Sequence, residues 1–216
     1  MEAFIYILFS VLDGLAIFIF AFNSFRIRLI EYWKEILFTV SVISVGTYLF
    51  SESAILKNIS PLITIILFIV ALIFYFRISL LSALRVTIVG FVAQIALTLV
   101  VTSIFCLVAN MSFNEVKETT FMRYILQFSG DFITILVSAL LKRKRIWVTN
   151  LPYSYTFKFK ISRTNLVLIF TSIIVTVFIS NIGIFNNIFI SAVLWLLIAI
   201  NISLFEVRKE MRQEYD

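Results

Sequence analysis

The sequence predicts an all-α fold, namely a polytopic membrane protein built as a bundle of seven transmembrane helices. Hydrophobic residues make up 62% of its 216 positions and charged residues only 14%, with a mean hydropathy of +1.07. A soluble domain is about 45–50% apolar and about 25% charged, so this composition indicates an integral membrane protein. Glycine and proline number only 5 and 2, which favours long, regular helices.

The apolar residues fall into seven segments separated by polar or charged connections. At a rise of about 1.5 Å per residue, about 20 residues cross a hydrocarbon core about 30 Å thick. The first segment carries Glu2 and no basic region before it, which favours a retained span over a signal peptide. The second segment is short and is expected to extend at both ends. The predicted spans are residues 3–22, 36–50, 59–76, 86–108, 121–141, 166–185 and 188–205.

Lysine and arginine are distributed unevenly over the connections. All but three of these 18 residues follow spans one, three, five or seven, and the exceptions are Lys57, Lys117 and Arg123. Because cytoplasmic loops are enriched in lysine and arginine, the N-terminus is predicted outside and the C-terminus in the cytoplasm of a multi-pass plasma-membrane protein. Residues 1–207 form the predicted transmembrane domain, and residues 208–216 a short, charged, cytoplasmic helical tail.

The connection after span five carries the largest group of basic residues, which are predicted to contact anionic lipid of the inner leaflet. Between Tyr153 and Ile161, aromatic residues alternate with polar and basic ones, a period of two that is typical of an extended segment. This segment either lies flat on the leaflet or offers a docking edge to a cytoplasmic partner. The residues predicted to contact lipid are Lys142, Arg143, Lys144, Arg145, Lys158, Lys160 and Arg163.

Polar residues recur every three or four positions in the span at 121–141, so they share one helix face. Asp13 and Asp131 lie near the middle of their spans, where an ionised carboxylate costs about 2.5–3.5 kcal/mol and should face the bundle interior. The spans that carry Gln94 and Gln127 are expected to face each other, with a hydrogen bond between these two side chains. The predicted intramembrane polar core comprises Asp13, Gln94, Arg123, Gln127, Asp131 and Asn201.

Three roles are open for this polar core. It could provide adhesion between helices, respond to a ligand and move the last span, or carry a cation or proton through Asp13 and Asp131. Transporters typically show repeated halves and helices interrupted by glycine or proline, and neither is visible in the sequence. The Ser129-Gly130-Asp131 segment lacks the Gly-x-Gly-Asp of intramembrane aspartyl proteases.

Composition also excludes several kinds of catalysis. The chain has no histidine, which excludes a Ser-His-Asp triad, a histidine phosphoacceptor and haem held by imidazole. Its one cysteine, Cys106, lies in an apolar span and is expected to be a buried small hydrophobe. No enzymatic activity, cofactor, metal or nucleic-acid partner is therefore expected.

The largest predicted external loop runs over residues 109–120. Its apolar residues Met111, Phe113 and Val116 are predicted to contact an external ligand, and the alternative is that they lie on the headgroup layer.

After the seventh span, strong helix formers run from Glu206 to Glu214, so a charged helix is predicted to leave the membrane. Seven spans, an external start, short external loops and this tail resemble the membrane-sensing half of peptide-pheromone sensor histidine kinases of the accessory gene regulator type. The stretches that carry the likeness are FRIRLIEYWKEIL, FRISLLSALRVTIVGFVAQ and FMRYILQFSGDFITILVSALLKRKR. Those kinases continue into a dimerisation helix and an ATP-binding domain, which have no counterpart before Asp216. The resemblance implies a bacterial, receptor-like module of quorum sensing without an output domain.

The leading hypothesis is a non-enzymatic receptor that senses a secreted peptide or the state of the membrane. It would relay through its last helix to a cytoplasmic or membrane partner, or act as a homodimer. The alternatives are an ion- or proton-coupled small-solute transporter that uses Asp13 and Asp131, and a structural subunit of a membrane complex.

Overall fold

The computed structural model describes residues 2–51 and 54–144 together with Trp195 and Ile198. These residues are helical apart from short connections, and no strand occurs among them, as the all-α prediction requires. The elements are α1 (Glu2–Ser24), the 3-10 helix η1 (Leu29–Tyr32), α2 (Trp33–Ser51), α3 (Ala54–Phe76), α4 (Leu80–Ala109), α5 (Phe113–Glu118) and α6 (Thr120–Arg143).

Four helical stretches in this part of the chain are long and apolar enough to cross a membrane. They are Ala3–Ser24, Leu29–Phe50, Leu80–Ala109 and Thr120–Arg143, and they correspond to predicted spans one, two, four and five. The second was expected to extend beyond residues 36–50 at both ends, but it runs over Leu29–Phe50 and therefore extends only at its start.

The third predicted span differs from the observed helix at its start. Residues 54–58 were expected in a loop, yet α3 begins at Ala54 and contains Pro61. Pro61 is the eighth residue of this helix, beyond the first turn, so it removes one backbone hydrogen bond from the helix interior. Predicted spans six and seven lie outside the described residues, except that Trp195 is helical and buried in the main core and Ile198 packs against that core.

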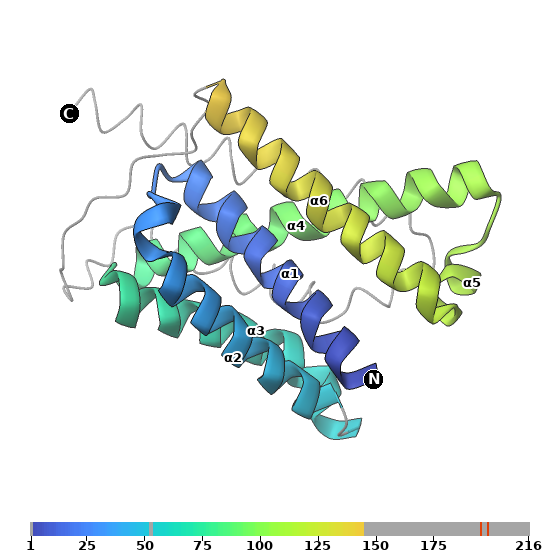
Figure 1. Ribbon diagram of the computed structural model, residues 1–216, viewed down its shortest axis with the longest axis horizontal. Helices are drawn as coiled ribbons and strands as arrows, with labels where there is room; N and C mark the ends of the chain where they lie inside the picture. The colour runs from blue at the N-terminus through green and yellow to red at the C-terminus, as the bar shows by residue number, and fades with distance from the viewer. Residues whose placement is uncertain (1, 52–53, 145–194, 196–197, 199–216) are drawn as a thin grey trace.

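The helices run up and down in an antiparallel bundle (Figure 1). Helix α1 packs against α2, α4 and α6, while α3 packs against α2 and α4. Helix α4 also packs against α6, which confirms the expectation that these two spans face each other.

Two glycines allow the close approach of neighbouring helices. A Cβ atom on Gly90 of α4 would lie 2.9 Å from Ile17 Cγ2 and 3.1 Å from the Ile17 carbonyl oxygen of α1. A Cβ atom on Gly130 of α6 would lie 2.6 Å from Thr98 Oγ1 of α4. Small residues at such contacts let membrane helices gain van der Waals packing, because the lipid supplies no hydrophobic force between them.

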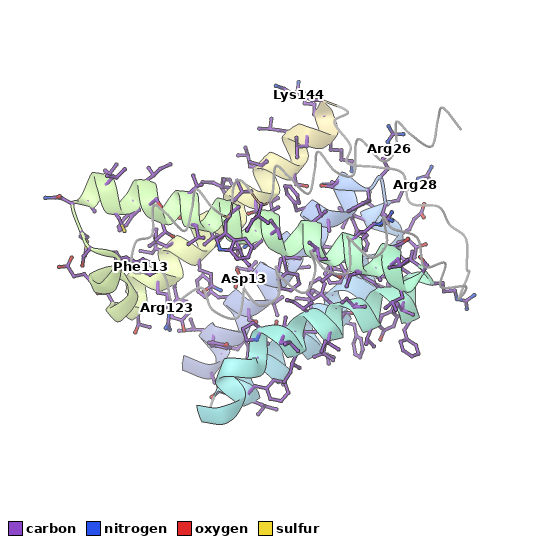
Figure 2. All side chains as sticks on the ribbon, turned by 180° about the vertical axis from the view of Figure 1, so that it is seen from behind. Asp13, Arg26, Arg28, Phe113, Arg123 and Lys144 are labelled. Carbon is purple, nitrogen blue, oxygen red and sulfur yellow. The ribbon has the colours of Figure 1, made fainter. Side chains whose placement is uncertain are left out.

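The two ends of the bundle differ in charge. Figure 2 shows Arg26, Arg28 and Lys144 at one end and Phe113 and Arg123 at the other, with Asp13 between them. The connection from α3 to α4, with Arg77, also lies at the first end, which we call the basic end. The opposite end, where α1 and α6 begin, is called the N-terminal end. The charge asymmetry read from the sequence is therefore an asymmetry of the folded bundle.

Candidate functional site

Four polar side chains from three helices meet in the interior of the bundle. Gln94 of α4 donates from Nε2 to Asp13 Oδ1 of α1, at 3.3 Å, and also to Asp131 Oδ1 of α6. Gln127, one turn before Asp131 on α6, donates from Nε2 to Asp13 Oδ2. We call these four residues the carboxyl cluster.

Helical spacing accounts for this convergence. Gln127 and Asp131 are four residues apart and lie on the same face of α6, as do the buried Thr134 and Ser138. The face of α6 that carries these residues packs against α1 and α4, so their side chains point into the bundle. Asp131 is 3% exposed and Gln94 is 6% exposed.

The carboxyl cluster has more acceptors than donors. Gln94 Nε2 lies within hydrogen-bonding reach of both Asp13 and Asp131, so the two carboxyl groups are close together in the bundle interior. Two carboxyl groups that share a buried site favour holding one proton between them, which leaves one negative charge on the pair. Gln94 Oε1 and Asp131 Oδ2 are both buried and accept no hydrogen bond from the described residues. A buried acceptor without a donor is destabilising by about 1–3 kcal/mol.

A cavity of about 390 Å³ adjoins the carboxyl cluster. Asp13, Gln94 and Gln127 border it, and residues of α2 and α3 complete its wall. It extends from the middle of the bundle toward the N-terminal end, since Thr47 lies in the last turn or so of α2 and Gln127 near the start of α6. Its further polar lining residues are Ser10, Ser44, Thr47, Thr64 and Thr98.

The half of the bundle toward the basic end is filled by aromatic side chains. Phe18 stacks on Phe68 with ring centroids 4.3 Å apart, and Phe22 meets Phe76 edge-on at 4.9 Å. Tyr32 of η1 covers Phe76 at 4.7 Å. Such aromatic contacts add about 0.5–1.5 kcal/mol each beyond the burial of their area. The cavity is therefore bounded by packed rings on the side of the basic end.

At the N-terminal end, two pairs of side chains join α1 to α2 beside the cavity. Ser10 Oγ lies 3.3 Å from Thr47 Oγ1, and the rings of Tyr6 and Tyr48 are 5.6 Å apart. Both pairs join α1 to α2, and all four residues are only partly buried.

A second polar contact lies closer to the basic end. Asn23 donates from Nδ2 to Ser138 Oγ at 2.8 Å, and Ser138 donates to the Ile19 carbonyl oxygen at 3.2 Å. Asn23 was not among the predicted core residues. It lies ten residues after Asp13, about 80° around α1, so the position of Asp13 did not indicate it.

The structure brings together four of the six predicted core residues, with a different pairing. Gln94 and Gln127 were expected to bond each other, but both donate to Asp13. Arg123 is exposed, and its guanidinium lies 5.5 Å from the centre of the Tyr124 ring, outside the carboxyl cluster. Asn201 lies outside the described residues.

The predicted external contact residues belong to a folded cap. Helix α5 begins at a capping box in which the side chains of Ser112 and Glu115 each accept from the other's backbone amide. Val116 is 3% exposed and packs with Cys106 and Leu126. Met111 is half-buried against the same residues.

Phe113, the third of these predicted contacts, is half-buried and packs against the main core. Val116 thus faces inward, while Phe113 and Met111 keep part of their surface exposed.

Of the residues predicted to contact inner-leaflet lipid, Lys142, Arg143 and Lys144 are exposed at the end of α6. Arg145, Lys158, Lys160 and Arg163 lie outside the described residues.

Comparisons with known proteins leave the site to be interpreted on its own geometry. No family model matches the chain, and no curated protein or solved structure is significantly similar to it.

Proposed function

We propose that this protein is a non-enzymatic, receptor-like integral protein of the plasma membrane, with its N-terminus outside and its C-terminus in the cytoplasm. It senses an external ligand, such as a secreted peptide, or the state of the membrane. The observation that carries the proposal is the cavity beside the carboxyl cluster, which extends toward the N-terminal end and is bounded by aromatic rings toward the basic end.

The position of the cavity favours sensing over conduction. The positive-inside rule assigns the basic end to the cytoplasm, so the cavity lies in the outer half of the membrane. A ligand that enters from outside would meet the carboxyl cluster and stop at the ring pair of Phe18 and Phe68.

Helix α6 supplies a route from the cavity to the cytoplasmic side. Gln127 borders the cavity, Asp131 belongs to the carboxyl cluster, and the helix ends at exposed basic residues beyond Lys142. A ligand that changes the hydrogen bonds of Gln127 would alter how α6 sits against α1. The resemblance to peptide-pheromone sensors adds a relay through the last helix to a cytoplasmic or membrane partner.

The proposal is tested by a distance measurement on the full chain in nanodiscs. Spin labels are placed at Ile30→Cys and Lys144→Cys, both at exposed positions of the basic end, in a Cys106→Ala background. The probe is the peptide fraction secreted by the source cells. We expect a saturable change in the distance between the labels that is weakened by Phe113→Ala, with Phe4→Ala as an exposed control.

An unchanged distribution of distances at every concentration of the peptide fraction, and on a change of lipid thickness, would refute a sensing role.

The approach of Asp13 and Asp131 to the same amide nitrogen, that of Gln94, favours a second candidate, an ion- or proton-coupled transporter of small solutes. Two carboxyl groups that share a proton within a membrane are a common element of proton pathways. In proteoliposomes, flux that is abolished by Asp131→Asn without loss of folding would support transport, and absence of flux across a broad solute set would remove it.

A further inference from the structure

We infer that the cavity binds a small organic cation, with a protonated amine held by Asp13 and Gln94 and an apolar body among the side chains of the remaining wall. This inference rests on the proposed function, because it names the ligand class of the same cavity. It follows from charge, from an unused acceptor and from the composition of the wall.

With one proton shared between them, Asp13 and Asp131 carry one negative charge. Among the described residues, the ion pair of Arg28 with Glu31 is exposed. Arg123, the nearest basic residue along α6, is exposed and turned over Tyr124. Within the membrane-length helices, Arg85 lies in the first turns of α4, nine residues before Gln94 and toward the basic end. Lysine and arginine are absent from residues 3–24, 35–56, 58–76, 86–116, 124–141 and 164–207.

An anion in a low-dielectric interior is destabilised unless an opposite charge lies nearby. A cation in the adjoining cavity would therefore be stabilised by the carboxyl pair, and the pair by the cation.

Gln94 has a side-chain oxygen that serves as an unused acceptor. Its amide nitrogen donates to both aspartates. This determines the orientation of the amide, because a flipped amide would place its oxygen against two carboxyl oxygens. Gln94 Oε1 is buried and accepts no hydrogen bond from the described residues, and the Gln94 side chain lines the cavity. An ammonium group has three donors and no acceptor, so it can bond both this oxygen and the Asp13 carboxylate.

The volume and wall of the cavity are those of a site for a small organic ligand. Small-molecule sites commonly measure about 300–1,000 Å³ and combine mostly apolar walls with a few polar groups, as this cavity does. Ile17, Val40, Phe68, Phe91 and Leu99 supply apolar surface. The faces of Phe68 and Phe91 also attract cations.

Two hydroxyl groups of the wall are engaged within their own helices. Thr47 Oγ1 donates to the Ser44 carbonyl oxygen and Thr64 Oγ1 to that of Ser60, both at 2.9 Å. Polarity is therefore concentrated at the carboxyl cluster. Within the described residues no group of three metal-ligating side chains occurs, and a bare metal ion would leave the apolar wall without a partner. An ammonium ion with an apolar body would contact the carboxyl cluster through its charge and the apolar wall through its hydrocarbon part.

The test uses the full chain in nanodiscs of phosphatidylcholine, a neutral lipid that does not itself concentrate amines. Binding of radiolabelled 2-phenylethylamine is measured, with competition by primary alkylamines from butylamine to decylamine. Each amine is matched by the alcohol of the same length, including 2-phenylethanol. The variants are Asp13→Asn, which removes charge, Thr64→Phe, which fills the cavity away from the cluster, and Glu35→Gln, a carboxyl control outside the cavity.

We expect saturable binding that amines displace at least tenfold better than the matched alcohols. Asp13→Asn and Thr64→Phe should each weaken it at least tenfold, while Glu35→Gln leaves it unchanged. The inference is overturned if alcohols compete as well as amines across the series, if no amine binds, or if Thr64→Phe binds like the wild type. The comparison of amines with alcohols needs no variant, so a failure of Asp13→Asn to fold does not impair it.

The spin-label experiment separates this inference from the proposed function. Amine binding, together with a distance between the labels that stays unchanged with the amine, with the peptide fraction and on a change of lipid thickness, would refute sensing and leave the amine site supported. A peptide that changes the distance while no amine binds would refute the amine site alone.

Discussion

Gln127 of α6 donates a hydrogen bond to Asp13 of α1, across 114 positions of the sequence. The two residues stand at the border of the cavity, so the same contact joins two helices and shapes the candidate site. A hydrogen bond to a carboxylate in the bundle interior should therefore contribute both to stability and to ligand response.

Replacing Gln127 by leucine should lower the free energy of unfolding by about 1–2 kcal/mol, because Asp13 loses a donor. Unfolding in mixed micelles, followed by circular dichroism, measures the change. Ser129→Ala is the control, since the Ser129 hydroxyl donates only to the Ile125 carbonyl oxygen of its own helix. Equal effects of the two substitutions would contradict the importance of the Gln127–Asp13 contact.

Replacing Gly90 by alanine should lower the free energy of unfolding by about 1–3 kcal/mol, because the new methyl group would meet the Ile17 backbone and force α4 away from α1. Gly46 provides a matched control on α2, where an added Cβ would find its nearest neighbour at 3.9 Å. Gly46→Ala should be neutral or stabilising by up to about 1 kcal/mol, from helix propensity. Thermal unfolding of both variants in detergent gives the comparison, and a tolerated Gly90→Ala would show that the two helices are not in close contact.

Arg77, directly after α3, has a φ of 50°, in the left-handed region that favours glycine. Arg77→Gly should raise the free energy of unfolding by about 1 kcal/mol through relief of backbone strain. Arg77→Ala removes the same charge and keeps the Cβ atom, so it should give no gain. A gain in both variants would assign the effect to charge instead.

Thiol labelling at Asn110 and at Ile30 tests the membrane orientation that the proposed function assumes. Both are exposed and lie at opposite ends of the bundle. In a Cys106→Ala background, a membrane-impermeant thiol reagent should label Asn110→Cys in intact cells and Ile30→Cys only after permeabilisation. The reverse pattern would place the cavity in the inner half of the membrane and remove the basis of the receptor proposal.

Much of the fold could be predicted because it depends on local properties. The apolar segments gave the helices, and the three- or four-residue spacing of Gln127, Asp131, Thr134 and Ser138 identified the buried face of α6. The short second span was correctly expected to lengthen, although it does so only at its start. The start of α3 was missed because polar residues before Pro61 read as a loop, whereas they continue the helix.

The partners of the carboxyl cluster could not be predicted in the same way. Helical periodicity specifies a face but not the rotation and depth at which two helices meet. The contact of Gly90 with Ile17 brings α4 close to α1, near the level at which Gln94 reaches Asp13 and not Gln127. Asn23 was missed since its partner, Ser138, is 115 positions away.

By itself the sequence determined that the chain forms apolar helices, which of their faces are polar and where the positive charge gathers, because each is a property of residues near one another in the chain. Only the tertiary structure decided that two aspartates and two glutamines share one cluster beside a cavity. The physical reason is that such contacts depend on how closely and at what height the helices pack, and distant residues set that geometry jointly.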